Sequence, residues 1–126
     1  MQIGELANAT GVSERMLRYY EQEGLLRPTR TEAGYRLYGE PELLAARRIR
    51  LLSASGLKIE SIRLLLPCMV GSGDADDPAT GTTFQPCDDV REVLRREIDK
   101  LDAKLRDLGE SRQIVASFLS GIEAAQ

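Results

Sequence analysis

Residues 3–26, IGELANATGVSERMLRYYEQEGLL, decide how the first part of the chain folds. Ile3, Leu6 and Ala7 recur at helical spacing and predict a short first helix. Thr10-Gly11-Val12 follows as a tight turn, since glycine accepts the backbone conformations that turns require. The stretch therefore opens with a short helix that ends in a turn.

The second half of this stretch predicts another short helix. Ser13 is a good N-cap, because its side-chain oxygen can accept a hydrogen bond from an amide in the first turn. Met16, Leu17 and Tyr20 form the apolar stripe of this helix, and Gly24 can end it. Two short helices joined by a turn of about four residues form the helix-turn-helix pattern, although many other helical hairpins share this pattern.

Residues 27–38, RPTRTEAGYRLY, have a different character. Pro28 breaks a helix, Glu32-Ala33-Gly34 favours a turn, and residues 35–38 alternate in polarity as a strand does. We therefore predict a short β-hairpin, or wing, directly after the helix-turn-helix.

Two further helices and a long loop are predicted next. Pro41, at the first helical position, opens a third helix that runs to about Ser55. A fourth helix extends from about Ile59 to Leu66. Residues 67–87 contain three Pro, three Gly and three Asp, which predicts a long loop, and a loop of this length in a small domain is usually functional.

From residue 88 to 122 the chain carries a heptad pattern. One series is Leu94, Leu101, Leu108, Val115 and Ile122, and the second is Ile98, Leu105 and Leu119, with Arg112 interrupting it. Such a helix cannot bury its apolar seam against itself, so we predict that it pairs with the same helix of a second copy. The alternative is packing against the chain's own N-terminal domain, for which the seam is too long and too regular.

The net charge of −3 conceals an uneven distribution. Residues 1–66 hold ten Lys/Arg and eight Asp/Glu, a balance of +2, whereas residues 67–126 hold seven and twelve, a balance of −5. Nine of the ten basic residues in the first part are arginine, which suits bidentate contacts to phosphate and guanine. The alternative interpretation is a solvated surface of mixed charge.

The composition argues against an enzyme and against a membrane protein. The chain has no histidine, so it has no Ser-His or Cys-His dyad and no histidine-containing zinc site. Its longest aliphatic run, Leu64–Leu66, is far short of the roughly 20 residues that cross a bilayer. Residues 1–5 lack the basic and apolar regions of a secretory signal. We expect a cytoplasmic protein with no membrane partner.

Three stretches together resemble the MerR family of bacterial transcription regulators. The first comprises residues 3–7 (IGELA), 10–13 (TGVS), 17–21 (LRYYE) and 24–26 (GLL), the second is residues 30–38 (RTEAGYRLY), and the third is the long terminal helix. The resemblance covers residues 1–66 closely and residues 88–119 in pattern.

The resemblance implies a mainly α fold in three parts. Residues 1–66 would form a winged helix-turn-helix DNA-binding domain, residues 67–87 an effector-region loop, and residues 88–122 a dimerisation helix in an antiparallel coiled coil. Such homodimers bind a pseudo-palindromic promoter and distort its spacer so that RNA polymerase can engage it. Bending or untwisting a site of 20–30 base pairs costs on the order of 1–6 kcal/mol, which an effector-driven shift between two protein conformations can supply.

The resemblance also assigns candidate DNA contacts by position. The recognition helix, which begins at Ser13, would read the major groove, and the wing would contact the backbone beside it. The assigned residues are Ser13, Arg15, Arg18 and Tyr19 in the recognition helix and Arg30, Tyr35, Arg36 and Tyr38 in the wing. The competing interpretation is a solvated charge for each arginine and a core aromatic for each tyrosine, and Tyr20 is assigned to the core.

The effector is left open by the sequence. Family members with short C-termini usually sense metals, oxidants or electrophiles, and Cys87 resembles the first metal-ligating cysteine of the metal sensors, but no Cys or His follows it. Cys68 and Cys87 bracket the long loop. They could form a reversible disulfide, hold a soft metal with a carboxylate such as Asp88, or be buried and inert. No cofactor is predicted with certainty.

Two other classes of protein explain part of the pattern. An excisionase-like architectural protein would share the winged helix-turn-helix but would not need the seam from Leu94 to Ile122. A coiled-coil adaptor would explain the seam but not the arginines and tyrosines of the wing. The sequence therefore favours a dimeric, sequence-specific transcription regulator.

Overall fold

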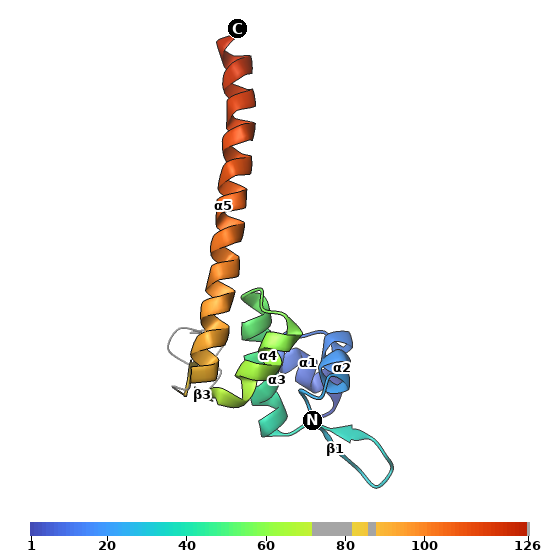
Figure 1. The fold of residues 1–126 in the computed structure, drawn as a ribbon. Helices are drawn as coiled ribbons and strands as arrows, with labels where there is room; N and C mark the ends of the chain where they lie inside the picture. Colours follow the sequence, from blue (N-terminus) through green and yellow to red (C-terminus); the bar gives the residue numbers. More distant parts are fainter. Residues whose placement is uncertain (72–81, 86–87, 126) are drawn as a thin grey trace. The chain divides into compact units, whose positions relative to one another are not determined.

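The computed structural model describes residues 1–71, 82–85 and 88–125. The chain divides into two compact units, Met1–Val90 and Arg91–Gln126 (Figure 1). Helices dominate both units, as the sequence predicts. None of the helices in the described part of the chain is long and apolar enough to span a bilayer.

The helix-turn-helix consists of α1 (Ile3–Thr10) and α2 (Glu14–Gln22). Between them Gly11 adopts a φ of 74°, in the left-handed region, and donates its amide hydrogen to Ala7 O at 2.8 Å. Ser13 caps α2 by accepting a hydrogen bond from the Met16 amide at 3.2 Å. The turn and the cap predicted from the sequence are both confirmed.

The wing consists of β1 (Thr29–Arg30) and β2 (Arg36–Leu37), which pair antiparallel. The connection between them contains Gly34 at a φ of 88°. The Thr31 hydroxyl accepts a hydrogen bond from the Tyr35 amide at 3.1 Å and stabilises the tip. The predicted hairpin is therefore present, with two residues in each strand.

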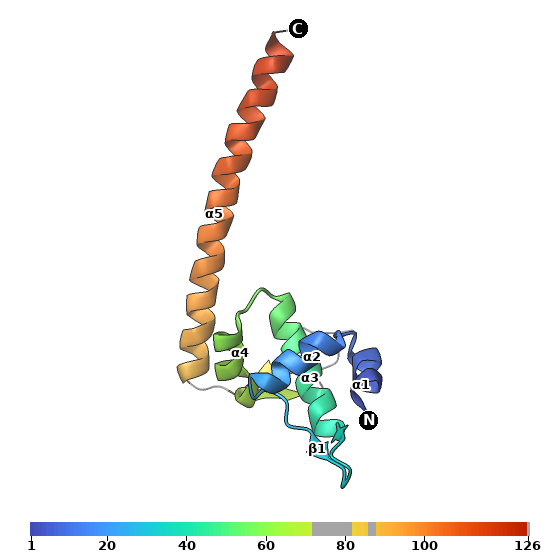
Figure 2. The same cartoon turned by 90° about the vertical axis from the view of Figure 1, so that its right-hand side faces the viewer.

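Two helices, α3 (Glu40–Ala54) and α4 (Ile59–Leu65), follow the wing. Helix α3 begins one residue before the predicted start, because Gly39 is the N-cap and donates its amide hydrogen to Glu42 Oε2 at 2.8 Å. Helix α1 packs against both α2 and α3, and Figure 2 shows the wing projecting beyond the start of α3. The recognition helix is therefore joined to α3 through α1.

One apolar core holds these elements together. Its fully buried large side chains come from α1, α2, the wing connections, α3 and α4, and they are Leu6, Leu17, Leu26, Tyr38, Ile49 and Leu65. Burying a side chain of this size stabilises the fold by about 1.5–3 kcal/mol. The recognition helix α2 is therefore held by a core to which α1, α3 and α4 also contribute.

The prediction of an unbroken loop over residues 67–87 is wrong at both ends. A short 3-10 helix, η1 (Leu66–Cys68), leads into β3 (Met69–Gly71), which pairs antiparallel with β4 (Thr82–Phe84). Met69 is buried and Phe84 is half-buried opposite it, so local apolar burial overrides the Pro- and Gly-rich composition of the whole stretch. Residues 72–81 and 86–87 lie outside the described part.

The long terminal helix, α5, spans Asp88–Ala124 and starts in the first unit. Its 37 residues correspond to a length of about 56 Å. The predicted helix, residues 88–122, is confirmed and continues two residues further.

Candidate nucleic-acid interface

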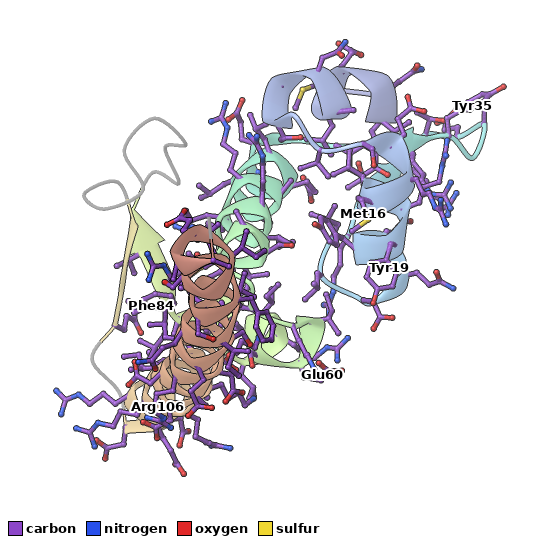
Figure 3. All side chains as sticks on the ribbon, turned by 90° about the horizontal axis from the view of Figure 1, so that it is seen from above. Met16, Tyr19, Tyr35, Glu60, Phe84 and Arg106 are labelled. Carbon is purple, nitrogen blue, oxygen red and sulfur yellow. The ribbon has the colours of Figure 1, made fainter. Side chains whose placement is uncertain are left out.

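Helix α2 exposes one polar face and buries the other. Leu17 and Tyr20 lie in the core, whereas Arg15, Arg18 and Tyr19 are exposed. Figure 3 shows Met16 and Tyr19 on this helix, and Met16, which we predicted to be part of the apolar stripe, is 39% exposed. A helix with this division can present its arginines to a groove while its apolar face remains in the core.

The exposed residues of α2 and the wing meet at a surface hollow of about 290 Å³, which we call the arginine hollow. It is lined by Gln2, Ile3, Arg18, Arg30, Gly34, Tyr35 and Arg36. Three arginines, one from α2 and two from the wing, therefore border one concave surface, and none of these lining residues is acidic. Such a surface attracts anions, and arginine suits the geometry of phosphate oxygens.

The two arginines of α2 are at most weakly held by other residues of the protein. Arg18 Nη2 lies 3.6 Å from Glu14 Oε2, and both side chains are exposed. Exposed ion pairs of this kind contribute at most about 1 kcal/mol, so a phosphate or a base edge can compete for Arg18. Arg15 makes no hydrogen bond or ion pair with the residues that the structure describes. Both side chains are therefore available to a ligand.

Arg36 has a structural partner that the sequence did not predict. Its Nε lies 2.9 Å from Glu21 Oε2 and donates a hydrogen bond to Glu21 Oε1 at 3.0 Å. Because Glu21 belongs to α2 and Arg36 to β2, this ion pair fastens the wing to the recognition helix. Arg36 therefore positions the wing as well as lining the arginine hollow.

The predicted surface position of Tyr38 is wrong. Its side chain is 1% exposed, and its backbone pairs with Met1 through hydrogen bonds of 2.7 and 2.8 Å. The hydroxyl lies 3.5 Å from Glu21 Oε2. Burial, followed by the nearby Glu21 carboxylate, raises the pKa of the Tyr38 hydroxyl, since both disfavour the phenolate. In this structure Tyr38 is a core residue at the base of the wing.

The other two wing residues occupy the hairpin itself. Arg30 donates a hydrogen bond from Nη1 to Gly34 O at 3.0 Å, which bridges the two sides of the hairpin. Tyr35 is 67% exposed, and Figure 3 shows it at the tip of the wing, directed away from the core. Both therefore belong to the exposed hairpin, as predicted for a wing.

The end of α2 is held by a contact that sequence reasoning missed. Arg63 of α4 donates hydrogen bonds from Nη2 to Glu23 O at 3.0 Å and to Glu23 Oε2 at 2.8 Å. This contact satisfies a carbonyl at the helix C-terminus, where intrahelical partners are lacking. No local pattern in the sequence signals it, because the two residues are 40 positions apart.

The cysteine region is only partly described. Cys68 is half-buried at the start of the β3–β4 hairpin, and its carbonyl accepts a hydrogen bond from the Gln85 amide at 2.9 Å. Cys87 lies outside the described residues, so the predicted Cys68–Cys87 pair is not tested. Among the described residues there is no group of three His, Cys, Asp or Glu side chains that could hold a metal ion.

The predicted dimerisation seam is exposed along α5. Leu94 is half-buried, and the remaining seam residues are exposed by 44 to 67%: Ile98, Leu101, Leu105, Leu108, Val115, Leu119 and Ile122. Ile114 and Phe118, which lie off the predicted seam, are also exposed. The apolar surface is therefore broader near the end of the helix than the heptad pattern indicated.

Comparison with known proteins gives one consistent result. Residues 1–67 match the family described as MerR HTH family regulatory protein. Heavy metal-dependent transcription regulator 2 of Rhizobium meliloti is 34% identical over 111 residues, which cover 87% of this chain and 68% of that protein. ZntR of Escherichia coli is 32% identical over 107 residues, which cover 84% of this chain and 69% of ZntR.

A solved structure agrees with these relatives. The transcription regulator PbrR691 from Ralstonia metallidurans, in complex with lead(II), matches with a TM-score of 0.71 and 29% identity, over 93% of this chain and 84% of PbrR691. The family match covers more than half of the chain and includes the helix-turn-helix and the wing. This chain belongs to the MerR family of DNA-binding transcription regulators.

Proposed function

We propose that two copies of this chain bind a pseudo-palindromic promoter through α2 and the wing of each copy. The arginine hollow carries this proposal, because it brings Arg18 of the recognition helix together with Arg30 and Arg36 of the wing. In this arrangement Arg15, Arg18 and Tyr19 face base edges in the major groove, and the wing residues contact the flanking backbone. The Ser13 hydroxyl accepts the capping hydrogen bond from the Met16 amide, and it can donate its own hydrogen to a phosphate.

The dimer is proposed to form through α5. Its apolar side chains are exposed over most of a 37-residue helix, and such a surface is buried most simply by the same helix of a second copy. A symmetric pair places two recognition helices on one DNA duplex, so the half-sites repeat the symmetry of the protein. An antiparallel arrangement of the two helices is the form that the family resemblance implies.

The regulatory step is proposed to be a distortion of the promoter spacer, which lets RNA polymerase engage the promoter. Distorting a site of this size costs on the order of 1–6 kcal/mol. An effector that binds or modifies one conformation of the dimer more favourably can supply a free energy of this size.

The effector is proposed to act through Cys68 and Cys87. Pairing of β3 with β4 holds the Cys68 carbonyl 2.9 Å from the Gln85 amide, and Cys87 follows Gln85 by two positions in the sequence. A peroxide would take two electrons and two protons from the two thiols, giving one disulfide and two molecules of water. Closing a loop of this length changes the free energy of unfolding by roughly 3 kcal/mol in the chain-entropy model.

A soft metal ion is the second candidate effector. PbrR691 was solved with lead(II), and the names of several relatives refer to heavy metals or mercury. Thiolates favour soft metals, and a carboxylate such as Asp88 could complete the coordination. This second proposal rests on the relatives and on the donor types, because Cys87 lies outside the described residues.

Binding and transcription measured on the gene's own upstream DNA test these proposals together. The reduced protein, the peroxide-treated protein and the protein with zinc or lead are compared with the Cys68→Ser and Cys87→Ser variants. We expect similar affinity in every state and a transcriptional response that both substitutions abolish. A response to metal but not to peroxide would replace the redox proposal, and no response at all would make the thiols structural.

A further inference from the structure

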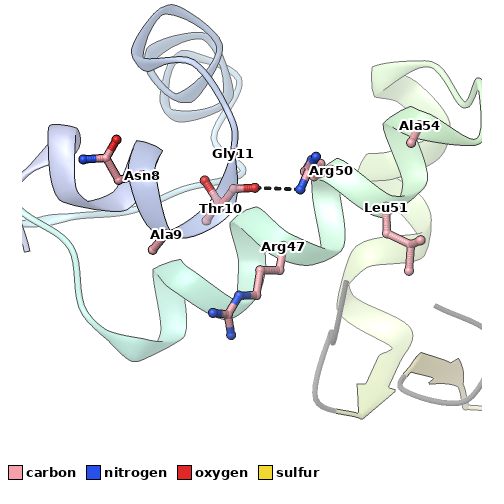
Figure 4. Close-up of a pocket in the computed structure, with 8 residues that line it drawn as sticks. All are labelled: Asn8, Ala9, Thr10, Gly11, Arg47, Arg50, Leu51 and Ala54. Atoms are coloured by element: carbon pink, nitrogen blue, oxygen red, sulfur yellow. Dashed lines mark hydrogen bonds between the residues drawn. The ribbon is translucent and has the colours of Figure 1, made fainter. Parts of the chain in front are cut away.

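A second basic pocket lies at the opposite end of α1 from the arginine hollow. It has a volume of about 520 Å³ and lies between the last turn of α1 and the second half of α3 (Figure 4). It is lined by Asn8, Ala9, Thr10, Gly11, Arg47, Arg50, Leu51 and Ala54. We call it the α1–α3 pocket, and it shares no lining residue with the arginine hollow.

Arg50 is fixed in the wall of this pocket. Its Nη1 donates a hydrogen bond to Thr10 O at 2.9 Å, across 40 positions of sequence (Figure 4). A Cβ atom on Gly11 would come within 3.2 Å of the same nitrogen, so glycine leaves room for the guanidinium to lie against the turn. This contact satisfies a carbonyl at the end of α1 and holds one positive charge at a defined place.

Arg47 supplies a second positive charge with no counter-ion. It is half-buried, and it makes no hydrogen bond or ion pair with any residue that the structure describes. It also borders a neighbouring hollow that Glu40 lines, but it forms no ion pair with Glu40. None of the residues that line the α1–α3 pocket is acidic. Two guanidinium groups without a carboxylate in one hollow favour an anionic ligand.

The position of the pocket identifies the anion. Gly11 is two residues before Ser13, the N-cap of the recognition helix, so the pocket lies within about 7 Å of chain from the part of α2 that enters the groove. In helix-turn-helix proteins the first helix crosses the DNA backbone. From this position and these charges we propose that Arg47 and Arg50 bind the phosphate backbone of the promoter.

The spacing of the two basic sites supports this inference. Gln2 and Ile3, at the start of α1, line the arginine hollow, and Asn8 to Gly11, at its end, line the α1–α3 pocket. A helix of eight residues is about 12 Å long, and the major groove of B-DNA is about 12 Å wide. The two sites can therefore hold phosphates on opposite sides of the groove that α2 enters. The inference rests on the proposed DNA-binding mode of α2.

Arg47→Gln is the decisive variant, because Arg47 has no partner within the described protein whose loss would disturb the fold. We expect the dimer to bind the promoter and an unrelated duplex of equal length more weakly, each by roughly 5- to 30-fold. The plot of log affinity against log salt becomes less steep by about 2, one contact for each copy. Arg47→Lys restores most of the slope, because it keeps the charge.

The controls separate this inference from the proposed function. Arg106→Gln removes the same charge from an exposed position on α5 and leaves affinity and slope unchanged. Arg18→Gln tests the recognition helix itself. If Arg18→Gln weakens promoter binding and Arg47→Gln does not, the phosphate site is overturned and the proposed function stands. If Arg47→Gln reduces transcription without affecting DNA binding, the pocket contacts a protein partner instead.

Discussion

The first unit of this protein buries a core of large apolar side chains, whereas the second unit leaves most of its own exposed. In the first unit Leu6, Leu17 and Leu65 are completely buried within one chain. In the second unit Leu105 and Leu108 are each 67% exposed. A domain that closes its own core can fold alone, whereas a helix with an open seam is stable only when another surface covers it. This contrast supports the proposal that the first unit recognises DNA and the second joins two copies of the chain.

Leu105→Glu in α5 should have the largest effect. If the seam forms a symmetric interface, each dimer gains two carboxylates in an apolar contact, and an unpaired buried charge costs about 3–5 kcal/mol. We expect the protein to become monomeric at micromolar concentration, with promoter binding reduced more than 100-fold, while circular dichroism shows the first unit still folded. Sedimentation and fluorescence anisotropy measure these changes.

Gln113→Glu is the matched control for this substitution. It introduces the same side chain on the same helix, at an exposed position outside the heptad seam. We expect it to leave the dimer intact. A dimeric Leu105→Glu protein would show that α5 pairs through another face, and would break the contrast between the two units.

Leu6→Ala in the first unit should have the next largest effect. Leu6 is completely buried in α1, and replacing such a leucine by alanine usually costs about 2–5 kcal/mol. We expect a loss of this size in the free energy of unfolding, measured by urea denaturation, for the first unit. The loss should be the same at all protein concentrations, because the core lies within one chain.

Leu119→Ala provides the comparison in the second unit. Leu119 is 56% exposed in the single chain, so its effect on unfolding should be largest where the protein is dimeric and should shrink as dilution shifts the equilibrium toward monomers. If the free energies of unfolding of Leu6→Ala and Leu119→Ala depended equally on protein concentration, the second unit would not differ from the first in needing a partner.

The sequence predicts those features whose signals are local. The cap at Ser13, the turn at Gly11, the wing around Gly34 and the heptads of α5 all follow from neighbouring residues, and all are present. Helix propensity, turn chemistry and periodicity each act over a few positions, so a single sequence contains them.

Features that depend on distant contacts were not predicted. The Glu21–Arg36 ion pair and the Arg63–Glu23 contact join residues 15 and 40 positions apart. The β3–β4 pairing was missed because each strand has only three residues and the surrounding stretch is rich in Pro, Gly and Asp, which indicates a loop. Tyr38 was placed on the DNA face by its position in the family resemblance, whereas its burial depends on Met1 and on the core beneath the wing.

Tyr38→Phe should have the smallest effect, and it tests how tightly the first unit closes around the wing. Because burial and then Glu21 raise the pKa of Tyr38 in the folded protein, the unfolded chain loses this proton first as the pH rises. The contribution of Tyr38 to stability is fully present below its unfolded pKa of about 10 and is lost as the pH rises through the folded pKa. Phenylalanine cannot ionise, so the variant should lose less stability than the wild type in this alkaline range.

At neutral pH the two should differ by less than about 1 kcal/mol, since the hydroxyl lies 3.5 Å from Glu21. Urea denaturation between pH 8 and pH 11, roughly one to two units either side of that value, measures the difference. Tyr35→Phe, at the exposed tip of the same wing, is the control and should follow the wild type. If Tyr38→Phe also followed the wild type, the wing base would be open to solvent at Tyr38, and the first unit would be less closed than its burial indicates.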